Sequence, residues 1–181
     1  MSKMKIICYG DSNTYGYDPR SFVGDRYDRT WPEVLAEKTG HTVTAMGMPG
    51  RQIPFRARPL EAMHEQIREH VDILMVMLGS NDIEASLNVK LVEARMHTMI
   101  KEVLRWNAAD RIILIGPPPL KVTKQHLEAS REMNNAFAGT AARLGVEYID
   151  SFDWPLTLCF DKTHLTEDDQ ETFADEIIKR L

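Results

Sequence analysis

Three residues near the two ends of the chain have the side-chain types needed for nucleophilic catalysis. Ser12 carries a hydroxyl, which becomes a good nucleophile only when a neighbouring base takes its proton. His164 is a suitable base, because the pKa of imidazole lies near neutrality. Asp161, three residues earlier, could accept a hydrogen bond from the other ring nitrogen and fix the tautomer. The sequence therefore predicts nucleophilic catalysis by Ser12, with His164 as base and Asp161 orienting it.

Such a nucleophile also needs hydrogen-bond donors for the oxyanion of the tetrahedral intermediate. The backbone N–H groups of Ser12 and Gly47 are candidates, since a glycine allows its amide to come close to a substrate. The side-chain amide of Asn81 could supply a third donor. We therefore predict an oxyanion hole formed by Ser12, Gly47 and Asn81.

The same clusters have structural interpretations. Residues 10–13 are typical turn residues. Residues 79–82 could begin a helix, with Asn81 or Asp82 as its cap, and we expect Asp82 to be structural. Asp161 and His164 could be ordinary surface residues, but their presence together with Ser12 favours catalysis.

Short apolar runs of strand length alternate with longer helical patterns. The expected strands cover residues 5–9, 41–46, 72–78, 111–115 and 146–149. The expected helices run from Thr30 to Gly40, then over 59–69, 87–106 and 125–144, with a last one from Thr166 to Arg180. Thr30 and Glu33 form a capping box, and Gly40 ends that helix.

Five strands that alternate with helices predict an α/β fold with a parallel sheet covered on both faces. In such sheets, functional residues gather at the carboxyl ends of the strands. Ser12, Gly47, Asn81 and the Asp161–His164 segment all follow predicted strands. The chain of 181 residues fits one domain, spanning 1–181.

The four clusters, in this order, resemble those of the SGNH (GDSL-type) hydrolase family. Residues 10–12 are Gly-Asp-Ser, Gly47 matches the glycine block, residues 79–82 are Gly-Ser-Asn-Asp, and residues 161–164 are Asp-Lys-Thr-His. The resemblance implies a flavodoxin-like three-layer α/β/α sandwich with a five-stranded parallel sheet. It also implies the same catalytic and oxyanion residues as above. Residues 10–19 and 48–51 are similar to the arylesterase and acyltransferase branch.

The chain departs from the family pattern at three positions. Asn13 stands where the name-giving leucine is usual. Ala45 replaces an asparagine that often precedes the second-block glycine by two residues. Asp169 stands where a glycine often follows the catalytic histidine by five. None of these changes removes a predicted catalytic group.

Several residues near the clusters are candidates for the substrate pocket, since such sites are mostly apolar with few polar groups. The candidates are Tyr15, Tyr17, Arg51 and Trp154. For the aromatic residues the alternative is packing, and for Arg51 it is a surface charge.

The composition excludes several other classes of protein. A net charge of −5 without a basic cluster argues against nucleic-acid binding. No run reaches the roughly 18 apolar residues of a membrane span. Two isolated cysteines and scattered histidines form no metal motif, so we expect no metal and no cofactor. The first residues resemble no signal peptide, and a cytoplasmic location is the expectation.

The expected function is hydrolysis of a small-molecule ester with a short acyl, aryl or sugar acetyl group through an acyl-enzyme. One alternative is an acyltransferase or perhydrolase that uses the same intermediate. Another is a non-catalytic ligand-binding α/β module, although the phosphate-binding glycine motifs are absent from the first turn. The resemblance to the acyltransferase branch implies self-association into a homo-oligomer.

Overall fold

A five-stranded, all-parallel sheet forms the centre of the computed structural model, which describes residues 3–181. The strands are β1 (Lys5–Gly10), β2 (Thr42–Gly47), β3 (Val71–Met77), β4 (Ala109–Gly116) and β5 (Glu147–Asp150). Their spatial order is β2-β1-β3-β4-β5, which is the order of flavodoxin-like sheets. The predicted fold class is therefore confirmed.

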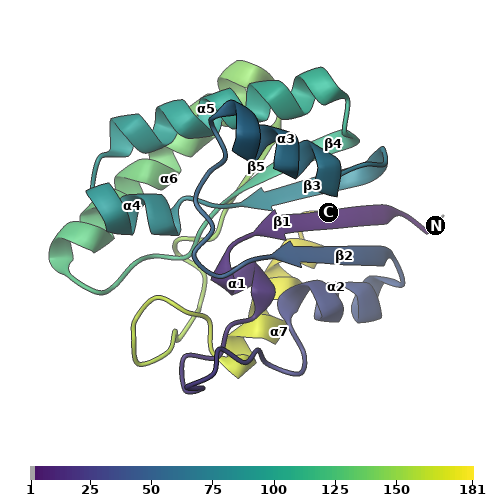
Figure 1. Ribbon diagram of the computed structural model, residues 1–181. Helices are drawn as coiled ribbons and strands as arrows, with labels where there is room; N and C mark the ends of the chain where they lie inside the picture. The colour runs from purple at the N-terminus through teal and green to yellow at the C-terminus, as the bar shows by residue number, and fades with distance from the viewer. Residues whose placement is uncertain (1–2) are drawn as a thin grey trace.

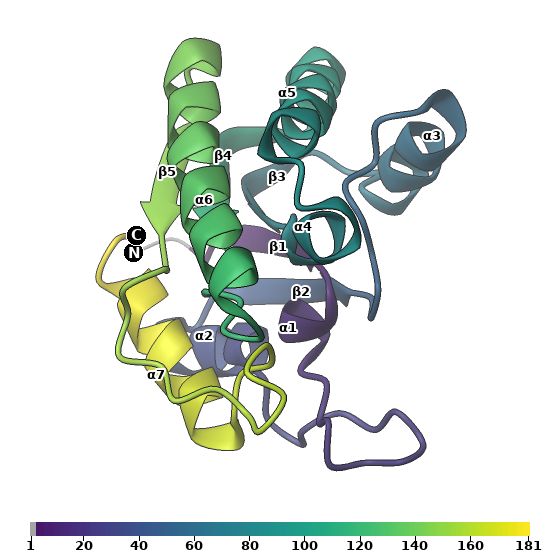
Figure 2. The same ribbon diagram turned by 90° about the vertical axis from the view of Figure 1, so that its left-hand side faces the viewer.

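Helices lie on both sides of this sheet (Figures 1 and 2). They are α1 (Ser12–Tyr15), α2 (Trp31–Thr39), α3 (Ala57–Gln66), α4 (Ser80–Ser86), α5 (Val89–Trp106), α6 (Lys124–Leu144) and α7 (Glu167–Ile178). α2 and α7 pack on one face of the sheet, and α3, α4, α5 and α6 pack on the other. None of the helices within residues 3–181 combines the length and the apolar character that crossing a membrane requires.

Alternate residues of each strand enter two separate hydrophobic cores, because successive side chains of a strand point to opposite faces. Ile7 and Leu74 belong to the core beneath α3, α5 and α6. Their neighbours Cys8 and Met75 belong to the core shared with α2 and α7. Near-continuous burial explains why the strand sequences contain long apolar runs rather than alternation.

The helix boundaries agree with the local signals of the sequence. At the start of α2, the Glu33 side chain accepts hydrogen bonds from the Thr30 backbone N–H at 2.7 Å and from the Thr30 hydroxyl at 2.8 Å. Gly40 ends α2 with a φ of 72°, a conformation that favours glycine. Thr166 caps α7 by accepting from the Asp169 N–H at 3.1 Å. These caps confirm the predicted starts of both helices.

The segment predicted as one helix over 87–106 is preceded by a second helix, α4, and the two are separated by a break. Leu87 adopts a φ of 51° and ends α4. The Asn88 side chain then caps α5 by accepting from the Leu91 N–H at 3.1 Å. The hydrophobic spacing from Leu91 onward fits α5, whereas the start at residue 87 was wrong.

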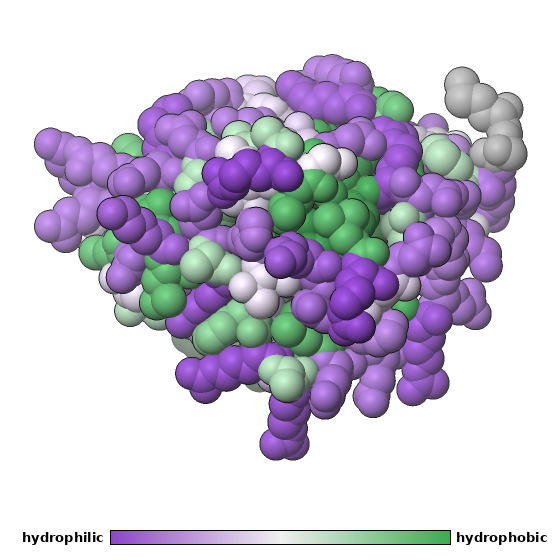
Figure 3. Space-filling view, turned by 90° about the horizontal axis from the view of Figure 1, so that it is seen from above, coloured by the Kyte–Doolittle hydropathy of each residue, from purple (hydrophilic) through white to green (hydrophobic). Residues whose placement is uncertain are grey.

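Helices cover both faces of the sheet as predicted, except at the edge strand β2, which contacts α1 and α2 but is otherwise largely exposed. The reason is that α3 packs against α5 rather than over β2. A groove of about 360 Å³ remains, and its lining includes Ile7, Thr44, Met46 and Val71. Figure 3 views the molecule from the side of α3, α5 and α6 and shows hydrophobic patches among hydrophilic side chains.

Candidate active site

The predicted site residues come from four loops that meet at one edge of the sheet. In the parallel register, Gly10 at the end of β1 lies opposite Gly47 of β2 and Met77 of β3. The segments that follow these strands therefore start at the same level. The loop before α7, which carries His164, lies at the same edge (Figure 1).

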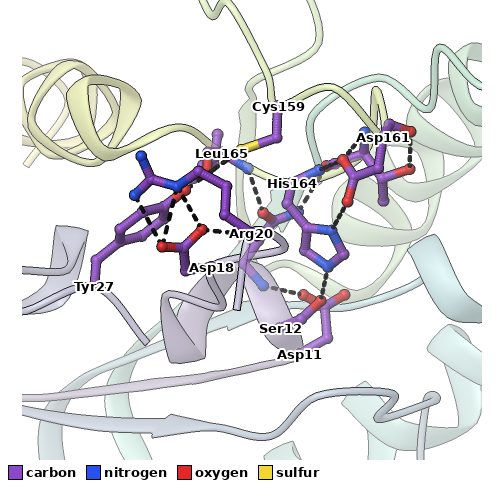
Figure 4. A network of polar contacts seen from close by, with 11 residues as sticks. Asp11, Ser12, Asp18, Arg20, Tyr27, Cys159, Asp161, His164 and Leu165 are labelled. Atoms are coloured by element: carbon purple, nitrogen blue, oxygen red, sulfur yellow. Dashed lines mark hydrogen bonds and ion pairs between the residues drawn. The ribbon is translucent and has the colours of Figure 1, made fainter. Parts of the chain in front are cut away.

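A chain of hydrogen bonds joins the three residues predicted to be catalytic (Figure 4). His164 Nε2 lies 2.9 Å from Ser12 Oγ, although the two residues are 152 positions apart. His164 Nδ1 lies 2.6 Å from Asp161 Oδ2. An ionised carboxylate can only accept, so Nδ1 carries the proton and the lone pair of Nε2 faces the serine hydroxyl. The arrangement allows the ring to accept the proton of Ser12.

Asp161 is fixed by its own loop as well as by the imidazole. Its Oδ1 accepts hydrogen bonds from the N–H groups of Thr163 and His164, both at 3.1 Å. Partial burial works to raise the pKa of the Asp161 carboxyl, but the hydrogen bonds from His164 and Thr163 outweigh burial and hold that pKa below its usual value. Asp161 is therefore an anion at neutral pH and can stabilise a protonated His164.

Ser12 sits at the start of α1, directly after β1. The preceding residue, Asp11, caps this helix by accepting from the Asn13 N–H at 3.0 Å. Asp11 is buried, and burial raises the pKa of its carboxyl to about 6. Its Oδ2 has no hydrogen-bond partner among residues 3–181. The turn is tight: a Cβ on Gly10 would lie 2.1 Å from Thr14 Oγ1.

The structure brings Gly47 and Asn81 into the same loop cluster as Ser12. A Cβ on Gly47 would lie 2.1 Å from the backbone nitrogen of Tyr15, so β2 ends in direct contact with α1. One hydrogen of the Asn81 amide is donated to the Arg51 carbonyl at 3.0 Å. The second hydrogen of that amide has no acceptor among the described residues. Their role as oxyanion donors stays a prediction.

Gly50 is a further backbone donor that the sequence analysis did not include. It has a φ of 75° and stands in a turn that is closed by the Arg51 N–H bonding to the Met48 carbonyl at 3.1 Å. Its own N–H takes part in none of the hydrogen bonds among residues 3–181. The signal was present in the sequence, because the dipeptide Pro49-Gly50 favours a turn with positive φ at glycine.

Arg51 was predicted to line the substrate pocket or to be a surface charge, but its side chain is buried and binds backbone carbonyls. Its guanidinium is buried beneath the strand ends, 4.1 Å from the centre of the Tyr9 ring. It donates to the carbonyls of Gly10, at 2.9 Å, and of Met46. Burial lowers the pKa of Arg51, although an arginine stays charged in proteins. Arg51 thus ties the ends of β1 and β2 together.

Asp82 is structural, as predicted. Its buried carboxylate accepts from the Ile53 N–H at 3.0 Å and from the Arg95 guanidinium at 2.7 Å. Burial raises the pKa of the Asp82 carboxyl, and the hydrogen bond from Arg95 opposes that rise. The carboxylate therefore joins α4, which carries Asn81, to the segment after β2.

The three aromatic candidates lie in different places. The ring of Tyr17 lies 4.9 Å from the imidazole of His164, centre to centre, so Tyr17 borders the site. The ring of Tyr15 is half-buried, with the guanidinium of Arg26 at 5.8 Å from its centre.

For Trp154 the structure favours the alternative, packing. Its ring packs 4.8 Å from that of Phe173, and the guanidinium of Arg180 lies 4.9 Å from the Trp154 ring centre. Phe173 and Arg180 lie beyond the first turn of α7, whereas His164 precedes that helix. Trp154 belongs to the hydrophobic core on that face because its ring covers apolar surface there.

Asp169, the departure from the family's glycine, supports the loop before His164. Its Oδ1 accepts from the Thr157 N–H at 2.8 Å, and its Oδ2 accepts from the N–H groups of Leu158 and Thr166, each at 2.9 Å. One buried carboxylate thus holds the start of α7 against the segment that leads into residues 159–166, which we call the histidine loop.

The fold is a flavodoxin-like α/β sandwich, and at the carboxyl end of its parallel sheet a serine, a histidine and a carboxylate are joined by hydrogen bonds. The sequence matches the GDSL-like Lipase/Acylhydrolase family over residues 8–173. Because that match covers most of the chain, the protein belongs to this family. It is therefore a carboxylic ester hydrolase rather than the non-catalytic binding module considered above. A comparison with curated proteins found no match.

Solved structures agree with this assignment of the fold. Est24, a carbohydrate acetylesterase from Sinorhizobium meliloti, is 21% identical with a TM-score of 0.82, over 99% of this chain and 100% of Est24. The M. smegmatis aryl esterase is 20% identical with a TM-score of 0.83, over 99% and 98% of the two chains. A putative arylesterase from Agrobacterium tumefaciens str. C58 is 21% identical with a TM-score of 0.80, over 99% and 100%.

Proposed function

We propose that the protein is a serine esterase that hydrolyses small carboxylic esters through an acyl-enzyme on Ser12. The observation that carries this proposal is the continuous hydrogen-bonded chain from Ser12 through His164 to Asp161. Each link of the chain has the donor and acceptor that nucleophilic catalysis needs.

In the first half-reaction, Ser12 Oγ attacks the ester carbonyl carbon while His164 Nε2 takes the hydroxyl proton. Asp161 stabilises the imidazolium that forms, since its low pKa keeps it ionised. The carbonyl oxygen becomes an oxyanion, which the N–H groups of Ser12 and Gly47 and the amide of Asn81 stabilise. The N–H of Gly50 is a further candidate donor, because Gly50 lies between Met48, whose N–H donates to the Gly10 carbonyl, and Arg51, whose carbonyl accepts from the Asn81 amide.

The tetrahedral intermediate then collapses. The bond between carbonyl carbon and alkoxy oxygen breaks, and the imidazolium gives its proton to the leaving alcohol. In the second half-reaction a water molecule attacks the acyl-enzyme, with His164 again acting as base. The products are a carboxylic acid, an alcohol and the free Ser12 hydroxyl.

The proposed substrates carry short acyl or aryl groups. Two apolar side chains next to site residues in sequence are exposed: Met48, which follows Gly47, at 49%, and Phe160, which precedes Asp161, at 74%. They offer shallow apolar contact rather than a deep channel for a long chain. The names of two structural neighbours, a carbohydrate acetylesterase and an aryl esterase, support this substrate class.

The experiment is a panel of p-nitrophenyl esters of increasing acyl length together with acetylated sugars, measured for the natural chain and for Ser12→Ala. We expect the highest kcat/KM with acetyl to butyryl groups and no turnover above background in Ser12→Ala. Faster hydrolysis of long-chain than of acetyl esters would refute the substrate class. Undiminished hydrolysis by Ser12→Ala would refute the mechanism.

A further inference from the structure

We infer that Asn13 is a positioning residue that holds the histidine loop against the nucleophile. It follows Ser12 directly in sequence and is only 3% exposed. Its side-chain Nδ2 donates to the Thr163 carbonyl at 3.3 Å. Its Oδ1 accepts from the Leu165 N–H at 2.9 Å. These two backbone groups stand immediately before and after His164, so one side chain fixes the backbone on both sides of the base.

The two bonds matter because, apart from the Ser12–His164 bond, the other hydrogen bonds of the histidine loop within residues 3–181 run inside the loop or to Lys121, Tyr27 and α7, and not to α1. The Cys159 N–H donates to the His164 carbonyl at 2.7 Å, and the Lys162 N–H to the Cys159 carbonyl at 2.8 Å. Asp161 accepts from within the same loop. Such bonds shape the loop but do not set its distance from α1. Among the described residues, the polar contacts between 11–16 and 159–166 are the two bonds of Asn13 and the Ser12–His164 bond itself.

The chemistry of the amide explains why this position takes asparagine in this chain. A carboxamide offers one acceptor and two donors at the same end of a short side chain. The Asn13 amide can therefore bind both the Thr163 carbonyl and the Leu165 N–H, which flank His164. Leucine, which the family's name places here, can do neither. An aspartate could accept from the Leu165 N–H, but its second oxygen would face the Thr163 carbonyl oxygen and be repelled by it.

The consequence is a nucleophile and a base that are set at reacting distance before substrate binds. A displacement of about 1 Å between reacting groups can lower a rate by roughly 10²-fold. Asn13 does not belong to the chain that passes the proton, so its loss changes distance rather than mechanism. This inference rests on the proposed function, because it assumes that His164 serves Ser12.

The test compares Asn13→Leu with the control Asn134→Leu. Asn134 is also a buried asparagine that joins two segments, through the Pro117 carbonyl at 3.0 Å and the Asp150 carboxylate at 3.2 Å. Pro117 follows β4 and Asp150 ends β5, so both partners lie outside the histidine loop. Both variants lose buried hydrogen bonds, so both are expected to lower the unfolding midpoint. Only Asn13→Leu is expected to change catalysis.

We expect Asn13→Leu to lower kcat for p-nitrophenyl acetate by about tenfold to a hundredfold, with KM within about twofold of the natural chain. The rate at which a small organophosphonate labels Ser12 is expected to fall in proportion, since labelling needs the same base. Asn13→Asp, which keeps the bond to Leu165, is expected to lie between the natural chain and Asn13→Leu. It also provides the measurement if Asn13→Leu does not fold.

The inference is overturned if Asn13→Leu, or Asn13→Asp where the former does not fold, retains the natural kcat and labelling rate. It is equally overturned if Asn134→Leu loses kcat to the same extent, because the effect would then be loss of stability alone. Ser12→Ala, assayed in parallel, tests the proposed function separately from the positioning role of Asn13. Full activity in Ser12→Ala contradicts the proposed function, whereas its inactivity beside a fully active Asn13→Leu contradicts only the positioning role.

Discussion

The buried carboxylate of Asp11 makes folding stability depend on pH in a way that one substitution can isolate. Burial raises the pKa of Asp11 from its usual 3.8 to about 6 in the folded chain. Below pH 3.8 the group is protonated in both the folded and the unfolded state and carries no penalty. As the pH rises from 3.8 to about 6, the Asp11 carboxyl ionises in the unfolded chain before it does so in the folded chain. Folding therefore becomes less favourable as the pH rises.

The size of the effect follows from the two pKa values. At about 1.4 kcal/mol for each pKa unit, the full penalty above pH 6 is about 3 kcal/mol. About 1 kcal/mol of it is already present at pH 4.5 and nearly all of it at pH 7.5, so the penalty grows by about 2 kcal/mol over this range. Asp11→Asn keeps an oxygen that can cap the Asn13 N–H but has no charge to bury. Any cost of its buried amide hydrogens is the same at both pH values.

The assay is urea unfolding of the natural chain and Asp11→Asn at pH 4.5 and pH 7.5, followed by tryptophan fluorescence. We expect the free energy of unfolding of the variant, relative to the natural chain, to rise by about 2 kcal/mol between the two pH values. The contributions of ionisable groups that do not interact with Asp11 are common to both chains and cancel. A relative stability that stays constant, or that falls with rising pH, contradicts the reasoning.

Three further predictions test the site and its support. Asp161→Asn is expected to lower kcat by about 10³- to 10⁴-fold with little change in KM, because an amide does not hold His164 in the required tautomer. Steady-state kinetics with p-nitrophenyl acetate measures this effect. A loss of less than about tenfold would contradict the role of Asp161. Gly47→Ala is expected to lower both stability and kcat, since its Cβ would lie 2.1 Å from the Tyr15 nitrogen and must displace α1. The matched control is Gly139→Ala in α6, where the Cβ meets only the end of the Arg143 side chain at 3.3 Å and thermal unfolding is expected to show a gain of up to about 1 kcal/mol. Asp82→Ala is expected to cost about 3 kcal/mol in urea unfolding, because it leaves the Arg95 guanidinium and the Ile53 N–H without their partner; a cost below about 1 kcal/mol contradicts this.

Elements of the fold with strong local signals could be predicted from the sequence. Residues 73–77 form an apolar run that is typical of a buried parallel strand, and they lie within β3. Thr30 and Thr166 mark helix starts through their own side chains, and Gly40 and Gly145 mark helix ends through positive φ. In these places, local preference and the final fold agree.

Features that depend on contacts between distant segments could not be predicted in the same way. The break at Leu87 requires a non-glycine residue at positive φ, which no local pattern indicates. The exposure of β2 follows from the position of α3, and hydrophobic spacing does not specify which neighbour a helix packs against.

The site shows the same division. Ser12, Asp161 and His164 could be predicted because their side-chain types and their places after strands are visible in the sequence. Arg51 was assigned to the pocket because its sequence position is next to the site, yet its flexible side chain turns inward to the Gly10 carbonyl. The partners of Asn13 are about 150 residues away, so its role became visible only in the folded chain.

The most direct measurement is the site of covalent labelling by a small organophosphonate ester, read by mass spectrometry of the intact chain and of its peptides. One adduct on Ser12 is expected, together with loss of esterase activity in the same proportion. In His164→Ala the adduct is expected to form at least about 10²-fold more slowly, because no base takes the hydroxyl proton. Complete inactivation with the adduct on another residue, or equal labelling of Ser12 in His164→Ala, would contradict the account.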